Sequence, residues 1–266
     1  MRCFKTILFA LLLCPIAIAA QGWNDNVYKQ IEQRVKQPEF PNRSFIITKY
    51  GAESKLSAAK NQIAINKAIL SCSKAGGGKV IIPSGIWNTG AITLKSNVNL
   101  VVEKGAHIIF AFDTSLYPIV KTRWEGMDCM NYQPCIYAYG EKNIAITGEG
   151  TIDGNGSVNT WWKMCGKDWF KAKEKITENQ NVGRPKLFEF VENGTPIEKR
   201  NMKGLGMRPQ LINLYKCEGI LIENVTLLNS PFWVMHPLLS KNITVKGVKV
   251  WNNGPNGDGC DPESCE

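Results

Sequence analysis

Histidine is scarce in this sequence, with only His107 and His236 among 266 residues. Neither lies near a Gly-x-Ser-x-Gly elbow, and no spacing of His and Cys matches a metal site. The glycines at 76–78 follow an expected helix, whereas a phosphate-binding loop opens one. These absences argue against a serine hydrolase triad, a zinc centre and a nucleotide-binding loop, and they predict no metal and no cofactor.

Long apolar segments are missing too, except at the N-terminus. Residues 1–20 begin with two basic residues, continue with the apolar run Ile7–Leu13 and end in small residues up to Ala20. This pattern is typical of a secretory signal peptide cleaved after Ala19 or Ala20. The run is shorter than the ~20 residues of a spanning helix. We therefore expect a secreted or periplasmic protein with no membrane segment after cleavage.

The charge balance points to an anionic partner. Lys and Arg exceed Asp and Glu by 9, and removing Arg2 and Lys5 with the signal peptide leaves +7. A basic exported protein attracts polyanions, although such a charge also simply aids solubility. Acidic polysaccharide fits an exported protein better than nucleic acid, because the lysines are scattered and form no dedicated basic face. We expect a monomer.

Seven cysteines remain once Cys3 and Cys14 are removed with the signal peptide. An odd number without paired spacing predicts no disulfide framework. Cys129 with Cys135, or Cys260 with Cys265, are possible pairs in an oxidising compartment. The alternative is that the thiols are buried as small hydrophobic groups.

Two helices are predicted near the N-terminus. The first covers 24–37, within an N-terminal helical segment at 21–44, and ends before Pro38. The second covers 57–74, where the apolar residues share one face and the glycines at 76–78 terminate the helix.

Short β-rich runs dominate from Lys79 onwards, and they repeat. The runs 218–229 and 241–252 align residue by residue at an offset of 23, and Cys217, Ser240 and Cys265 follow the same spacing within two residues. Val98 and Ile144 are 46 residues apart, which is twice 23. A fixed period with short strands predicts an all-β solenoid, a right-handed parallel β-helix over 45–266 with short N-terminal capping helices. A leucine-rich repeat lacks its leucine signature here, and a sandwich would not repeat residue by residue.

One long segment, 155–208, interrupts the repeat. In a solenoid such an insertion forms a loop on one face, often the binding face. Its Trp161, Trp162 and Trp169 either stack on sugar rings or pack the insertion onto the wall. The 57–74 helix is expected to cover the open edge of the first rung.

Candidate chemistry gathers near the C-terminus. His107 alternates with apolar neighbours and reads as structural, while His236 is either a sugar contact or a satisfied core histidine. Asp258, with Asn256 beside it, suits activation of a water in glycoside hydrolysis. Carboxylates so close together also suit calcium or a plain turn, and spacing alone leaves these readings open for Asp258 and Asp261.

Several motifs together add a family resemblance that covers the chain from about Phe45. They include the stretches GGGKVIIPSGIWNTGAITLKSNVNLVVEKGA, GEGTIDGNG, RPQLI, NVTLLNSPFWVMHP and GPNGDGCDPESC. In this order they resemble glycoside hydrolase family 28, the polygalacturonases. The resemblance implies a parallel β-helix that hydrolyses α-1,4-galacturonide links of pectin with inversion and without a metal.

The resemblance also implies roles for single residues. Asn256-Gly257-Asp258 stands where the family has Asn-Thr-Asp, so Asp258 is expected to activate water, and Asn256, His236, Arg208 and Asp261 are expected to bind substrate. The family's later Asp-Asp pair, Gly-His-Gly and Arg-Ile-Lys do not occur. We therefore expect a C-terminally truncated polygalacturonase-like chain, inactive alone because it lacks the general acid.

Two other functions remain open at this stage. A pectate lyase-like β-helix would cleave by calcium-dependent elimination, and a non-catalytic β-helix would only bind acidic polysaccharide. Unsaturated products distinguish the first, and binding without turnover distinguishes the second.

Overall fold

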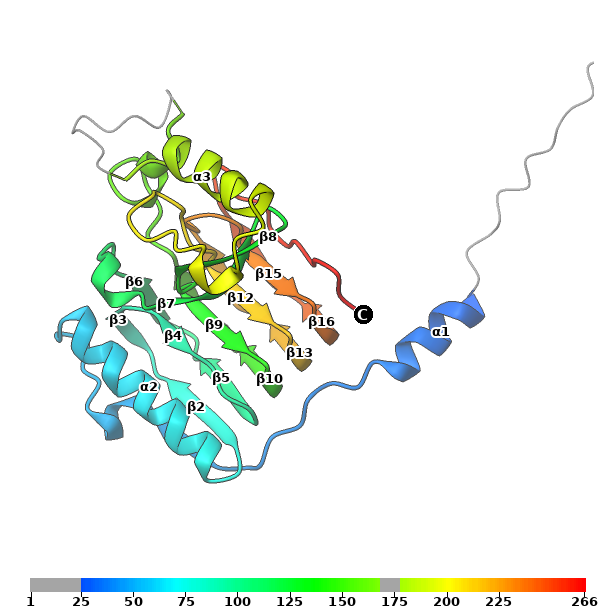
Figure 1. Cartoon of the computed structure of the whole chain (residues 1–266). Helices are drawn as coiled ribbons and strands as arrows, with labels where there is room; N and C mark the ends of the chain where they lie inside the picture. Colours follow the sequence, from blue (N-terminus) through cyan, green and yellow to red (C-terminus); the bar gives the residue numbers. More distant parts are fainter. Residues whose placement is uncertain (1–24, 168–177) are drawn as a thin grey trace, which may run out of the picture. The chain divides into compact units, whose positions relative to one another are not determined.

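The computed structural model describes residues 25–167 and 178–266, in which parallel strands stack rung upon rung into a β-helix (Figure 1). The predicted signal peptide and Trp169 lie outside the described residues. Among the described residues, those up to Val35 belong to one unit and those from Lys36 onwards to the other. The helix expected over 24–37 is observed as α1 (Asp25–Arg34). No described helix has the length and apolar character needed to cross a membrane.

Three parallel sheets make the wall of the β-helix, and they confirm the predicted fold class. The first contains β1 (Ser44–Ile46), β2 (Gly78–Ile82), β5 (Val98–Val102), β10 (Lys142–Thr147), β13 (Glu218–Glu223) and β16 (Lys241–Lys246). The second contains β3 (Gly85–Thr89), β6 (Ala106–Phe110), β11 (Thr151–Asp153), β14 (Thr226–Leu228) and β17 (Lys249–Trp251). The third contains β4 (Ile92–Thr93), β9 (Ile136–Tyr139), β12 (Ile212–Tyr215) and β15 (Met235–Leu238).

The period of 23 is the true rung length near the C-terminus. Ile220 pairs with Ile243, Leu227 with Val250 and Ile212 with Met235. The prediction that the 46-residue offset between Val98 and Ile144 spans two periods is wrong. In the structure β5 pairs directly with β10, so this offset is a single rung that carries an insertion.

Equivalent apolar residues stack through the centre of the wall. Leu100, Ile146 and Ile222 lie in neighbouring strands in register and are fully buried or nearly so. The next member, Val245 on β16, is 40% exposed. Each Å² of apolar surface buried in such a stack contributes about 25 cal/mol to the free energy of folding. This burial is the main source of stability in a solenoid.

Cys217 and Ser240, which the 23-residue spacing aligns, lie on neighbouring rungs and are hydrogen-bonded. The Cys217 N–H donates to Ser240 Oγ at 2.9 Å, and the Glu266 N–H donates to Ser240 O at 3.0 Å. All seven cysteines in the described ranges carry free thiols, and only Cys260 and Cys265 are not buried. The interpretation as buried thiols therefore holds for most of them.

Helix α2 (Ala58–Lys74) covers the first rung, as expected, with Ile65, Ala68, Ile69 and Cys72 on its buried face. Its polar side chains complete the open strand edge. Asn66 accepts from the Thr93 N–H at 2.8 Å and donates to Ala91 O at 3.0 Å. An edge strand satisfied in this way offers no free ladder to another chain. After the helix the chain passes close to Asn97 at Gly77, where a β-carbon would lie 2.5 Å from Asn97 O, so only glycine fits at this position.

Two insertions stand on the outer side of the third sheet. The first is an antiparallel hairpin, β7 (Ile119–Trp124) and β8 (Met127–Tyr132), and the second carries α3 (Gln180–Glu192). They share a second apolar core, made of Trp124, Cys129, Leu187, Met202, Met207 and Phe232. Figure 1 shows β7, β8 and α3 gathered at the same side of the wall.

The two described tryptophans of the second insertion, Trp161 and Trp162, make contacts inside the protein. Trp161 is fully buried, with its ring edge-on to Phe112 and Tyr117. Trp162 Nε1 donates to Ser230 O at 2.8 Å. These two side chains thus anchor the insertion to the wall.

Candidate functional site

Three acidic residues lie together on the last rung of the third sheet. The segment after β17 pairs with β15 through the bridges Met235 to Cys260 and Leu238 to Glu263. These bridges set the register between β12, β15 and the last segment. In that register, three columns of side chains point away from the main core. The columns are Gln210–Trp233–Asp258, Asn213–His236–Asp261 and Tyr215–Leu238–Glu263. The fold therefore brings Asp258, Asp261 and Glu263 to one outer face.

Asp258 is the exposed member of this set. Its main-chain oxygen accepts from the Val234 N–H at 2.9 Å, which fixes the backbone while the carboxylate faces solvent. Such a carboxylate is free to orient a water molecule.

Asp261 has a different environment. One of its oxygens, Oδ2, is buried and has no hydrogen-bond partner. Burial, and then the charge of Asp258, raise the pKa of Asp261 to about 6. A carboxyl group with a raised pKa is suited to hold a proton near neutral pH.

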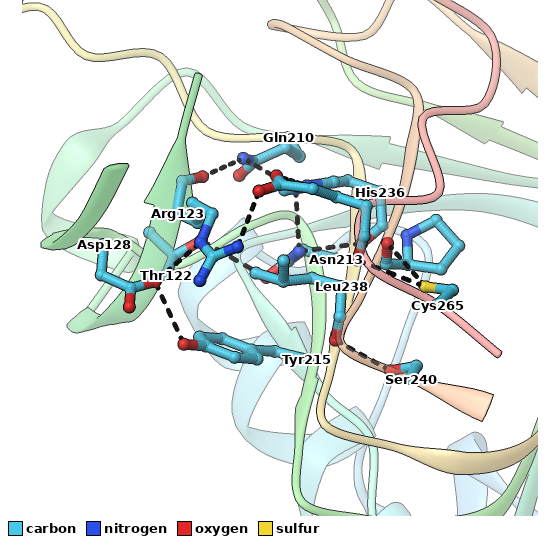
Figure 2. Close-up of polar contacts among 12 residues, drawn as sticks. Thr122, Arg123, Asp128, Gln210, Asn213, Tyr215, His236, Leu238, Ser240 and Cys265 are labelled. Atoms are coloured by element: carbon cyan, nitrogen blue, oxygen red, sulfur yellow. Dashed lines mark hydrogen bonds and ion pairs between the residues drawn. The ribbon is translucent and has the colours of Figure 1, made fainter. Parts of the chain in front are cut away.

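Glu263 is held from two sides. Its Oε1 accepts from Arg123 Nη1 at 2.7 Å, and its Oε2 lies 3.1 Å from His236 Nε2. Arg123 also donates to Asp128 at 2.9 Å (Figure 2). Burial opposes charge on Arg123, but these two carboxylates outweigh it and raise its pKa. The hairpin thus supplies the cation that fixes Glu263.

His236 is fully buried beneath the acids, which favours the alternative of a satisfied core histidine, and a substrate contact through it stays a prediction. Its Nδ1 lies 3.1 Å from Asn213 Nδ2 and 3.3 Å from Gln210 Nε2. Both amide nitrogens also donate to main-chain oxygens, which fixes their orientation. Nδ1 therefore accepts, and Nε2 carries the proton that it donates to Glu263. Burial lowers the pKa of His236 despite the Glu263 hydrogen bond.

Arg208 is also fully buried, so it too offers no surface to a substrate. Nη1 donates to Pro231 O and Pro255 O, both at 2.8 Å. Nη2 donates to Gln180 Oε1 at 2.8 Å and to Asn256 Oδ1 at 2.9 Å. Burial lowers the pKa of Arg208 to about 10, so the side chain remains a cation at neutral pH.

Asn256 adopts the left-handed conformation, with φ 55°, two residues before Asp258. Asn tolerates this conformation better than most residues. Gly257 follows, where the resembled family has Thr, and a β-carbon there would collide with the Asn252 side chain. The departure from the family motif is therefore matched to the local packing.

Other sequence features are distributed as follows. His107, read as structural, lies on β6 with Nε2 3.4 Å from Asp153 Oδ2 and belongs to a different sheet from the acids. Arg123 and Asp128, which lie at the site, were not predicted as site residues from the sequence. Their signal was present as two β-rich runs joined by Glu125-Gly126, which is a hairpin pattern. Within the described ranges, no three His, Cys, Asp or Glu side chains are grouped to hold a metal ion.

Comparisons with known proteins agree with this geometry. The chain is 31% identical over 216 residues to a Vitis vinifera protein named "Probable polygalacturonase", covering 77% of this chain and 37% of that protein. It is 27% identical to an exo-poly-alpha-D-galacturonosidase of Dickeya chrysanthemi, covering 80% of this chain and 37% of that protein. No family model matches the chain.

A solved structure is similar as well. The hyperthermoactive exopolygalacturonase of Thermotoga maritima is 38% identical with a TM-score of 0.84, covering 91% of this chain and 54% of that one. The chain is thus a homologue of polygalacturonases, as the motifs predicted, and spans about a third to a half of their length.

Proposed function

We propose that this chain carries part of the active site of a polygalacturonase-type glycoside hydrolase, which cleaves α-1,4-galacturonide links of pectin with inversion. The carrying observation is the set of outward-facing acids at Asp258, Asp261 and Glu263, on a β-helix homologous to proteins named polygalacturonase.

Asp258 is the proposed group that activates water. Inverting glycosidases place a base and an acid on opposite sides of the bond, ~6.5–9.5 Å apart. Asp258 is exposed and unencumbered, whereas Glu263 is neutralised by Arg123. Asp261 is the proposed substrate contact. Its pKa of about 6 lets the carboxyl group accept a hydrogen bond from a sugar hydroxyl when ionised and donate one when protonated. Among residues 25–167 and 178–266 we assign no general acid.

The proposed substrate is an acidic polysaccharide, and the protein is proposed to act on it as a monomer. The net charge, +9 for the full chain and +7 without Arg2 and Lys5, favours encounter with polygalacturonate over a neutral glycan. Export is proposed from residues 1–20, and N-terminal sequencing of the exported protein should find a new terminus after Ala19 or Ala20. An intact Met1 would refute export by this route.

Calorimetric titration with oligogalacturonides and product analysis test the proposal together. We expect binding that weakens with salt and little turnover by this chain, with any products saturated and of inverted configuration. Absence of binding to oligogalacturonides, with binding to a neutral glycan, would overturn the assignment. Unsaturated products that vanish with chelator would assign a lyase in its place.

A further inference from the structure

Arg208 is a buried cation that, within the described ranges, donates to no carboxylate. Its four acceptors are oxygens of Gln180, Pro231, Pro255 and Asn256. Removing an ion from water costs several kcal/mol, so a site that keeps one must recover that cost in local hydrogen bonds. The Phe232 ring, 5.1 Å from the guanidinium carbon, covers the cation further.

The four acceptors come from three separate segments. Gln180 begins α3, Pro231 lies in the chain leading to β15, and Pro255 with Asn256 forms the turn before Asp258. A planar guanidinium presents donors in several fixed directions, so one side chain can join all three segments. Lysine carries one compact ammonium on a flexible stem and cannot reproduce this geometry.

Two of the four acceptors belong to the turn that carries the candidate catalytic group. Asn256 adopts φ 55°, a conformation that Asn tolerates but that is less favourable for it than for Gly, so hydrogen bonds to its side chain stabilise the turn. Arg208 supplies that support through Asn256 Oδ1, and it holds the preceding carbonyl of Pro255. The direction in which the chain reaches Asp258 therefore depends on Arg208.

We propose that Arg208 is a positioning residue that fixes the Pro255–Asn256 turn and, through it, the carboxylate of Asp258. The catalytic part of this statement rests on the proposed function, whereas the ordering of the turn does not. It gives a buried Arg208 a role that needs no direct contact with a substrate.

Hydrogen exchange measured on Arg208→Met tests the ordering without any substrate. We expect exchange in the peptide 252–258 to rise about tenfold or more while β13 and β16 keep theirs. Arg208→Lys should give the same rise, because it keeps charge without the fork. Arg200→Met is the matched control, since Arg200 also binds main-chain oxygens, those of Thr195 and Asp128, and it has no bond to the turn.

A second variant keeps the test decisive if Arg208→Met does not fold. Asn256→Ala removes one of the two bonds to the turn and should raise exchange in the same peptide by a smaller factor. Unchanged exchange in 252–258 for a folded Arg208 variant, or for Asn256→Ala, would overturn the proposal.

Titration with trigalacturonate separates this inference from the proposed function. If the unmodified chain binds, Arg208→Met should weaken binding about tenfold, whereas Arg200→Met should change it less than about twofold. Binding that is equally strong in Arg208→Met would contradict positioning of the site. If the unmodified chain does not bind, the proposed function fails, and the exchange result alone decides the role of Arg208.

Discussion

Glu263 Oε2 accepts a hydrogen bond from His236 Nε2 at 3.1 Å, while Oε1 of the same carboxylate accepts from Arg123 at 2.7 Å. This shared carboxylate joins the last rung to the rung below and to the hairpin. Replacing Glu263 with Gln should cost about 1–2 kcal/mol of unfolding free energy, because a charge-assisted bond is lost next to a half-buried cation.

Urea unfolding measures that cost. The matched control is Glu149→Gln, since Glu149 pairs with Lys104 at 3.7 Å with both side chains largely exposed. We expect the control to change stability by less than about 0.5 kcal/mol. Equal losses in the two variants would show that the Glu263 network is not special.

The burial of His236 predicts an acid-sensitive contribution to stability. Its pKa is lowered in the folded protein, so the unfolded chain binds the proton at higher pH. This contribution is complete above about pH 6.5 and is lost as the pH falls towards the folded value. His236→Gln should be less stable at every pH and should lack this slope in urea unfolding between pH 5 and pH 8. A variant that kept the full slope would contradict the assignment.

Asp261 should act in the opposite direction. Its pKa is raised to about 6 in the folded state, so its favourable contribution is present below about pH 4 and is lost as the pH rises through about 6. Asp261→Asn should therefore be more stable than the unmodified protein at pH 7, by about 1 kcal/mol after allowing for solvent screening. Thermal melts should show this gain shrinking below pH 4. A gain independent of pH would refute the shifted pKa.

The apolar stack offers an internal comparison. Ile222 is fully buried between Ile146 and Val245, whereas Val245 itself is 40% exposed. Ile222→Ala should cost about 2–5 kcal/mol and Val245→Ala less than about 1 kcal/mol, because only the first leaves a closed cavity. Urea unfolding distinguishes them, and similar losses would argue against the stacking described.

The regular part of the fold was predictable because each rung repeats the one before it. The 23-residue offset places Ile220 beside Ile243, and the apolar face of 57–74 predicted the helix that covers the first rung. The hairpin between β5 and β10 was missed, because an insertion inside one rung lengthened its offset to 46 and mimicked two rungs.

The site was only partly predictable. Asp258 and Asp261 do share one outer face, but spacing along the chain cannot reveal that Arg208 and His236 are buried beneath it. Their burial depends on carbonyl and amide oxygens from loops far away in sequence, such as Gln180 and Pro231 for Arg208. The sequence left a buried His236 open as an alternative, but it gave no sign of the distant oxygens that bury Arg208.

The central claim is that the outer face carrying Asp258 and Asp261 receives a galacturonide. Mapping amide chemical shifts during titration with trigalacturonate tests it most directly. The account predicts shifts confined to residues around 233–236 and 256–263, with Asp258→Asn binding at least as tightly, since a like charge is removed. No binding, or shifts on another face such as the Asn97 and Asn143 turns, would contradict it.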